Sequence, residues 1–176
     1  AIKALIMRDQ DRAAPRGTGD VKVGGNYASS IWSLEAAHQK GFSNVLYLDA
    51  ATHSKVEEFG AANFFGIKNN TYVTPKSLSI LPSITNKSLR QIAQDLGLTV
   101  EERDIPVEEL ATFEEAGACG TAAVISPIGA LYDLDNGVTY DYGMKVGETC
   151  KKMYDHLQGI QYGRVEDVHN WNVEVM

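Results

Sequence analysis

The chain has 176 residues, of which 44% are hydrophobic and 22% are charged, a composition typical of one soluble globular domain with a sizeable core. Its formal net charge of −7 gives no basic surface for nucleic acid or an anionic membrane, and no apolar run approaches the length of a membrane span. Cys119 and Cys150 fit no metal-ligand or redox spacing, so we expect free thiols in a reducing cytoplasm. The four histidines are scattered, and no metal site is expected.

A glycine-rich loop around Lys22 is the first notable segment along the chain. Its glycines, between Gly17 and Gly25, permit close backbone approach by a bulky partner. A desolvated lysine in such a loop would be able to form a Schiff base with a carbonyl cofactor. Taken alone, however, the segment is more typical of a loop with a solvated lysine. Its spacing matches neither the phosphate loop of nucleotide hydrolases nor a dinucleotide-binding fingerprint.

Helices and short strands alternate irregularly after this loop. The first helix is predicted over 26–40, with Asn26 as its N-cap. The other expected elements are a strand at 45–48, a turn-like segment at 55–63, a hairpin of 64–67 and 72–74, a helix at 85–96 closed by Gly97, a strand at 99–105, a helical turn at 107–110, a loop at 117–125 that leads into a strand, a hairpin around 135–137 and a helix at 146–157. This order favours a mixed β-sheet of the α+β class over a doubly wound parallel sheet.

Three further segments carry polar groups suited to a ligand. At Ile84-Thr85, the start of the helix at 85–96, backbone N–H groups and a hydroxyl would cradle an anion, although an N-cap without a ligand is the commoner arrangement. Thr121-Ala122 would expose N–H groups with little side-chain bulk, or would simply turn into a strand. In the pair Glu57-Glu58, one carboxylate would be able to face a cationic ring nitrogen, although solvated pairs are commoner.

Taken together in this order, the motifs resemble the fold-type IV pyridoxal-phosphate enzymes, most closely the branched-chain amino acid aminotransferases. The resemblance covers nearly the whole chain and is most specific from Gly17 to Tyr27. The tail, Ile160 to Gly163 followed by Trp171, is also similar to the carboxyl end of that family. The resemblance implies a pseudo-barrel or mixed β-sheet flanked by helices, with residues 1–176 forming the single large, cofactor-binding C-terminal domain.

The same resemblance implies a role for each motif residue. Lys22 would form the Schiff base with pyridoxal 5′-phosphate and then act as the base of a 1,3-proton shift. Tyr27 would hydrogen-bond the phenolic oxygen of the cofactor, and Glu58 would pair with its protonated pyridine nitrogen. The phosphate would be bound by the N–H groups of Ile84 and Thr85 and by the hydroxyls of Thr85 and Thr121. The substrate α-carboxylate would be bound by the N–H groups of Thr121 and Ala122.

The implied reaction moves an amino group between leucine, isoleucine or valine and 2-oxoglutarate, in a homodimer. Ser83 and Asn86 stand where the family usually has Gly and Arg, and Ala123 and Ser126 replace the redox cysteines of some members, so no thiol switch is expected. We expect the family's smaller N-terminal domain to be absent and the chain to turn over weakly by itself. The alternatives are a D-amino-acid aminotransferase, an aminodeoxychorismate lyase, or a catalytically silent binding domain.

Overall fold

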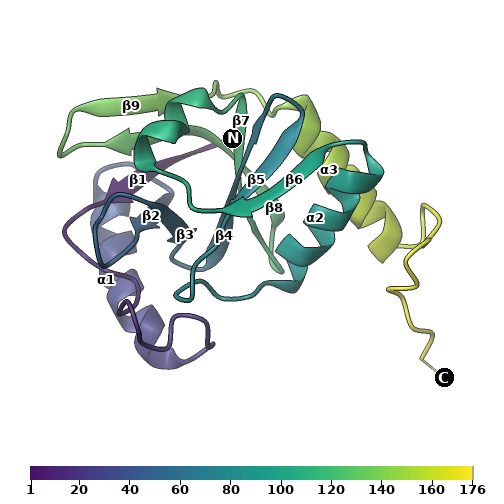
Figure 1. Cartoon of the computed structure of the whole chain (residues 1–176), viewed down its shortest axis with the longest axis horizontal. Helices are drawn as coiled ribbons and strands as arrows, with labels where there is room; N and C mark the ends of the chain where they lie inside the picture. The colour runs from purple at the N-terminus through teal and green to yellow at the C-terminus, as the bar shows by residue number, and fades with distance from the viewer. Residues whose placement is uncertain (176) are drawn as a thin grey trace.

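A mixed β-sheet that closes on itself forms the centre of the computed structural model, which describes residues 1–175 (Figure 1). Within those residues the sheet has nine strands in the order β3-β2-β1-β8-β7-β4-β5-β6, with β9 beside β8. Because β3 also pairs with β4, the strands from β3 to β4 form a ring. The predicted pseudo-barrel is therefore confirmed. The strand bounds are β1 Ile2–Met7, β2 Asn44–Leu48, β3 Val56–Phe59, β4 Ala62–Lys68, β5 Thr71–Pro75, β6 Thr99–Arg103, β7 Glu115–Gly120, β8 Val124–Asp133 and β9 Val138–Asp141.

Helices flank the barrel, as predicted. They are α1 Gly24–Gln39, α2 Ile84–Asp95, α3 Glu148–Gln161 and the short 3-10 helix η1 Val107–Thr112. Figure 1 shows α1 on one side, with α2 and α3 together on the other. Across residues 1–175, none of the helices combines the length and the apolar character needed to cross a membrane.

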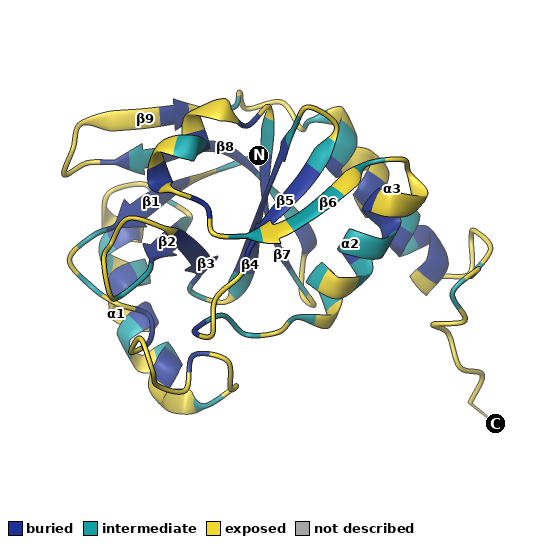
Figure 2. Ribbon diagram, viewed as in Figure 1, coloured by how far each residue is buried: buried dark blue, intermediate teal, exposed yellow. Residues whose placement is uncertain are grey.

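Both faces of the central strands are buried (Figure 2). Ile6, Leu46 and Phe64 belong to one apolar cluster inside the barrel. Phe65, the next residue along β4, belongs to a second cluster with α2 and α3, because successive strand residues point to opposite faces. A third cluster lies between α1 and strands β1 and β2. This two-sided burial accounts for the continuous apolar runs of the strands.

Some predicted elements are wrong. Segment 55–63, expected to be a turn, contains β3 and the start of β4. The strand was not predicted because two of its four residues, Glu57 and Glu58, are charged residues that are buried here. Segment 117–125, expected to be a loop, forms the end of β7, a turn and the start of β8. Its small residues have a packing role, because a Cβ on Gly117 would strike the ring of Phe65. Strand β1 was not predicted. The hairpins, the three helices and the turn at η1 are confirmed within a few residues at their ends.

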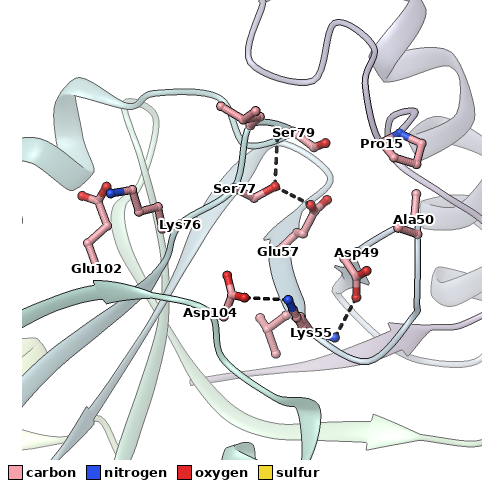
Figure 3. A pocket seen from close by; sticks show the side chains of 13 residues that line it. Pro15, Asp49, Ala50, Lys55, Glu57, Lys76, Ser77, Ser79, Glu102 and Asp104 are labelled. Atoms are coloured by element: carbon pink, nitrogen blue, oxygen red, sulfur yellow. Dashed lines mark hydrogen bonds and ion pairs between the residues drawn. The ribbon is translucent and has the colours of Figure 1, made fainter.

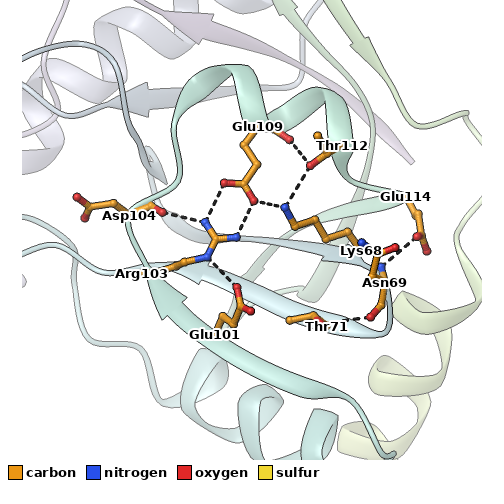
Figure 4. Close-up of polar contacts among 9 residues, drawn as sticks. All are labelled: Lys68, Asn69, Thr71, Glu101, Arg103, Asp104, Glu109, Thr112 and Glu114. Atoms are coloured by element: carbon orange, nitrogen blue, oxygen red, sulfur yellow. Dashed lines mark hydrogen bonds and ion pairs between the residues drawn. The ribbon is translucent and has the colours of Figure 1, made fainter.

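An ion cluster fastens η1 to the sheet (Figure 4). Glu109 accepts hydrogen bonds from Arg103 Nη1 at 2.8 Å and Nη2 at 2.6 Å, and it also pairs with Lys68. Arg103 and then Lys68 lower the pKa of Glu109 to about 2. The ionised carboxylate is thus favoured by the folded state.

We expect Glu109→Gln to lower the free energy of unfolding at pH 7 and to flatten its decline in acid. The folded pKa of about 2 lies below the ordinary value of 4.5, so this stabilisation is present above pH 4.5 and is lost as the pH falls toward 2. Urea unfolding across this pH range measures the effect, with Glu108→Gln, an exposed neighbour on η1, as the control. Parallel pH profiles for Glu109→Gln and the unaltered chain would contradict the expectation.

Candidate active site

A pocket of about 300 Å³ gathers most of the predicted site residues. It lies where the loop before α1, the β3–β4 turn, the segment before α2 and the end of β7 meet. The predicted residues that line it are Lys22, Tyr27, Glu58, Ile84 and Thr121. Thr85 and Ala122 directly follow two of these residues but do not line the pocket themselves. The structure therefore brings together five residues from distant parts of the sequence.

The loop that carries Lys22 is held by Asn26. The prediction that Asn26 caps a helix is wrong, because α1 already begins at Gly24 and Asn26 lies within its first turn. Instead, the buried Asn26 Nδ2 donates to the carbonyl oxygens of Thr18 at 2.6 Å and Val21 at 2.9 Å. These bonds fold the loop back on the helix and leave Lys22 exposed at the pocket.

Glu58 is a buried carboxylate whose two oxygens are both held by the chain. Its Oε1 forms an ion pair with Arg12 Nη2 at 2.8 Å and accepts the N–H of Leu81 at 3.0 Å. Its Oε2 accepts from Asn63 Nδ2 at 3.1 Å. Burial raises the pKa of Glu58 to about 7, although Arg12 and the Leu81 N–H oppose the rise. A carboxyl group with this pKa can hold or share a proton near neutral pH.

Glu57, the other member of the acidic pair, serves a different pocket. That pocket has a volume of about 520 Å³ and is also lined by Asp49, Lys55 and Asp104 (Figure 3). Glu57 accepts a hydrogen bond from Ser77 Oγ at 2.7 Å, and burial raises its pKa. Because the side chains of successive strand residues point to opposite faces, the two carboxylates of β3 lie on opposite faces, and Glu58 is the one that lines the site.

Helix α2 points its first turn toward the pocket. It begins at Ile84, and Ser83 is its N-cap, because Ser83 Oγ accepts the N–H of Asn86 at 3.2 Å. By helix geometry the N–H groups of Ile84 and Thr85 have no intrahelical acceptor, so they are free to bind an anion. Asn86, where the resembled family has Arg, is engaged elsewhere: its Oδ1 accepts from Tyr72 at 2.7 Å.

The turn at 121–123 joins β7 to β8 at the pocket. Gly120 pairs with Val124 across it, and Val124 has φ +60, in the left-handed region where three-residue hairpin loops normally place glycine. A β-branched residue in this region is strained, so the surrounding packing must hold the turn in place. Thr121, the first residue of the turn, lines the pocket.

Sequence analysis did not identify Arg12 and Cys119 as pocket residues. Arg12 offered one signal, an arginine next to the small residues Ala13 and Ala14 just before the glycine-rich loop. Cys119 is free and buried, as is Cys150, and burial raises the pKa of the Cys119 thiol to about 12. Cys119 therefore stays protonated at neutral pH and is not a nucleophile there.

The fold and this pocket define a class of enzyme. The family described as amino-transferase class IV matches residues 2–131, and the chain belongs to that family. It is 50% identical over 178 residues to the branched-chain-amino-acid aminotransferase of Haemophilus influenzae, an alignment that covers 97% of this chain and 52% of that protein. It is likewise 50% identical over 167 residues to the branched-chain-amino-acid aminotransferase of Helicobacter pylori, covering 94% of this chain and 48% of the other.

Solved structures give the same result for the fold. The branched-chain amino acid aminotransferase of Escherichia coli superposes with a TM-score of 0.84 at 29% identity, covering 97% of this chain and 56% of that one. The branched-chain amino acid aminotransferase of Thermobaculum terrenum in its PLP form has a TM-score of 0.84 at 27% identity, covering 97% and 54%. The predicted fold-type IV architecture is confirmed. The chain spans about half the length of the curated relatives it matches.

Proposed function

We propose that this chain is the cofactor-binding domain of a branched-chain amino acid aminotransferase. In this proposal the whole enzyme moves an amino group between leucine, isoleucine or valine and 2-oxoglutarate. The observation that carries the proposal is the convergence of Lys22, Tyr27 and Glu58 with the start of α2 in one pocket. The 50% identity to two branched-chain aminotransferases supports the choice of substrate class.

The groups in the pocket suit pyridoxal 5′-phosphate. They include an amine for an aldehyde, a phenol, a buried carboxylate for a ring nitrogen, and helix N–H groups for a phosphate. Arg12 Nε is also buried there and has no hydrogen-bond partner within residues 1–175. When bound, the cofactor supplies an electron sink for the electrons released when the substrate Cα–H bond breaks.

The residues would then divide the work. Lys22 Nζ would bind the cofactor's aldehyde carbon and later carry the proton removed from the substrate Cα. Glu58 would keep the ring nitrogen protonated, and Tyr27 would donate to the phenolic oxygen. The N–H groups of Ile84 and Thr85, with the hydroxyls of Thr85 and Thr121, would bind the phosphate. The N–H groups of Thr121 and Ala122 would bind the substrate α-carboxylate.

A substrate panel tests the proposed function. The chain, loaded with pyridoxal phosphate, would be given leucine, isoleucine, valine or D-alanine with 2-oxoglutarate, and glutamate would be measured. In a separate assay it would be given aminodeoxychorismate, and pyruvate would be measured. We expect slow but measurable turnover that favours the three branched L-amino acids, because the chain spans about half the length of the relatives it matches and would exclude less water from the pocket. A preference for D-alanine would favour the D-amino-acid alternative, release of pyruvate from aminodeoxychorismate would favour the lyase, and failure to take up the cofactor would favour the silent binding domain.

We also propose that the enzyme is a homodimer located in the cytoplasm. The two buried free thiols support a reducing compartment. Helix α1 supports an interface, because it exposes Ile31 and Trp32 by 68% and 71%.

Trp32→Glu is expected to convert the dimer to a monomer, because a charge would replace an apolar anchor. Light scattering after size-exclusion chromatography gives the mass. Tyr162→Glu, an exposed aromatic residue at the end of α3, is the control and should leave the mass unchanged. If Trp32→Glu remains a dimer, the interface does not depend on Trp32 and the proposed position of the interface is wrong.

A further inference from the structure

Arg12 lies at the junction of three segments that build the pocket. Its side chain is only 3% exposed, and it comes from the loop between β1 and α1. Its Nη2 pairs with Glu58 Oε1 at 2.8 Å, donates to the carbonyl oxygen of Gly19 at 2.9 Å, and donates to the carbonyl oxygen of Ser79. One guanidinium thus joins the loop of Lys22, strand β3 and the segment that leads into α2.

The Arg12–Glu58 pair is buried on both sides, so neither charge is stable without the other. Glu58 is 5% exposed, and removing one member of such a pair leaves an uncompensated charge in the interior. Glu57 also faces this charge, because Arg12 opposes the rise in its pKa, but Glu57 hydrogen-bonds to Ser77 in the other pocket. The positive charge of Arg12 therefore pairs with the carboxylate of Glu58 and not with that of Glu57.

The two carbonyl bonds of Arg12 give it a geometric role as well. Gly19 and Ser79 lie so close together that a Cβ on Gly19 would stand 2.7 Å from both the Cα and the carbonyl carbon of Ser79. Arg12 donates to both residues across this contact. All three contacts of Arg12 fall on Nη2, at the tip of the rigid, planar guanidinium, whereas lysine would bring a flexible ammonium to this point.

We propose that Arg12 is a positioning residue of this site: it fixes the Glu58 carboxylate at the pocket wall and ties the Lys22 loop to the segment before α2. The tie itself is a property of the chain, whereas its consequence for the cofactor rests on the proposed function. Arg12 thereby sets the spacing between the proposed attachment lysine and the proposed phosphate cradle.

Three variants test the proposal. Arg12→Gln removes the charge and the rigid guanidinium, and Arg12→Lys keeps the charge alone. Arg8→Gln is the matched control, because Arg8 also pairs with a buried carboxylate, Asp133 at 2.7 Å, but does not line the pocket. Each variant is measured for the affinity of pyridoxal phosphate by absorbance, for titration of Glu58 by carboxyl ¹³C NMR, and for amide exchange over 17–22 and 77–83.

Arg12→Gln is expected to weaken cofactor binding by at least about tenfold, the loss that follows removal of one charge-assisted hydrogen-bond partner. It should also raise the titration point of Glu58 above about 7 and speed amide exchange in both segments. Arg12→Lys should restore the titration of Glu58 but not the slow exchange. Arg8→Gln should change none of these three readouts.

The outcomes separate this proposal from the proposed function. If the unaltered chain binds no cofactor, the proposed function fails, and the Glu58 titration and the amide exchange still decide the role of Arg12. If Arg12→Gln matches Arg8→Gln in both of those readouts, the proposal is overturned. Full rescue of amide exchange by Arg12→Lys would overturn the tying role, because charge alone would then suffice.

Discussion

Lys22→Ala is expected to abolish both the absorbance change that follows addition of pyridoxal phosphate and any turnover. Lys22 is the pocket's amine within residues 1–175, and alanine supplies neither a nucleophile for the aldehyde nor a carrier for the Cα proton. Its side chain is exposed, so the variant should retain the stability of the parent.

The matched control is Lys76→Ala. Lys76 is also exposed, and it lines two neighbouring pockets but not the one that contains Lys22. It should keep the absorbance change and the activity. If Lys22→Ala and Lys76→Ala respond alike to the cofactor while both are folded, Lys22 is not the attachment residue.

Gly19→Ala is expected to damage both the fold and the site. The added Cβ would stand 2.7 Å from the Cα and the carbonyl carbon of Ser79 and closer still to its carbonyl oxygen, and backbone cannot move aside as a flexible side chain can. We expect a loss of about 1–3 kcal/mol in the free energy of unfolding, typical of overpacking. Cofactor affinity should fall as well, because the two segments held together by Arg12 would be forced apart.

Gly25→Ala is the control within the same glycine-rich segment. A Cβ on Gly25 would meet nothing within 4 Å, and the residue lies in the first turn of α1. Alanine there should stabilise the chain by about 0.4–1 kcal/mol, mainly by restricting the unfolded state. Urea unfolding and a cofactor titration of both variants give the comparison; equal behaviour would show that the contact between Gly19 and Ser79 does not constrain the site.

The parts of the fold that were predictable depend on residues close together in sequence. The turn at Asn69 and Asn70 adopts the left-handed conformation that such residues tolerate, and Gly97 has the positive φ that ends α2. Closure of the barrel was not predictable from these signals, since it depends on pairing β1 with both β2 and β8 and on pairing β3 with β4. Such pairings join distant segments, and local residue patterns do not specify them.

In the site, too, the predictable features depend on neighbouring residues and the unpredictable ones on distant segments. The Lys22 loop and the start of α2 were located from their own residues, and both reach the pocket. Local residues could not show which of Glu57 and Glu58 lines the pocket, because that depends on the two faces of strand β3. Arg12 was missed because its partners, Glu58 and Ser79, come from other segments of the chain.

One measurement tests the central claim most directly. The folded chain is mixed with pyridoxal phosphate, treated with borohydride, digested and mapped by peptide mass spectrometry. We predict a single major covalent adduct, on the peptide that contains Lys22, because its amine lines the pocket that also presents Tyr27 and Glu58. No adduct, or an adduct spread over exposed lysines such as Lys76, would contradict the claim that this pocket holds the cofactor on Lys22.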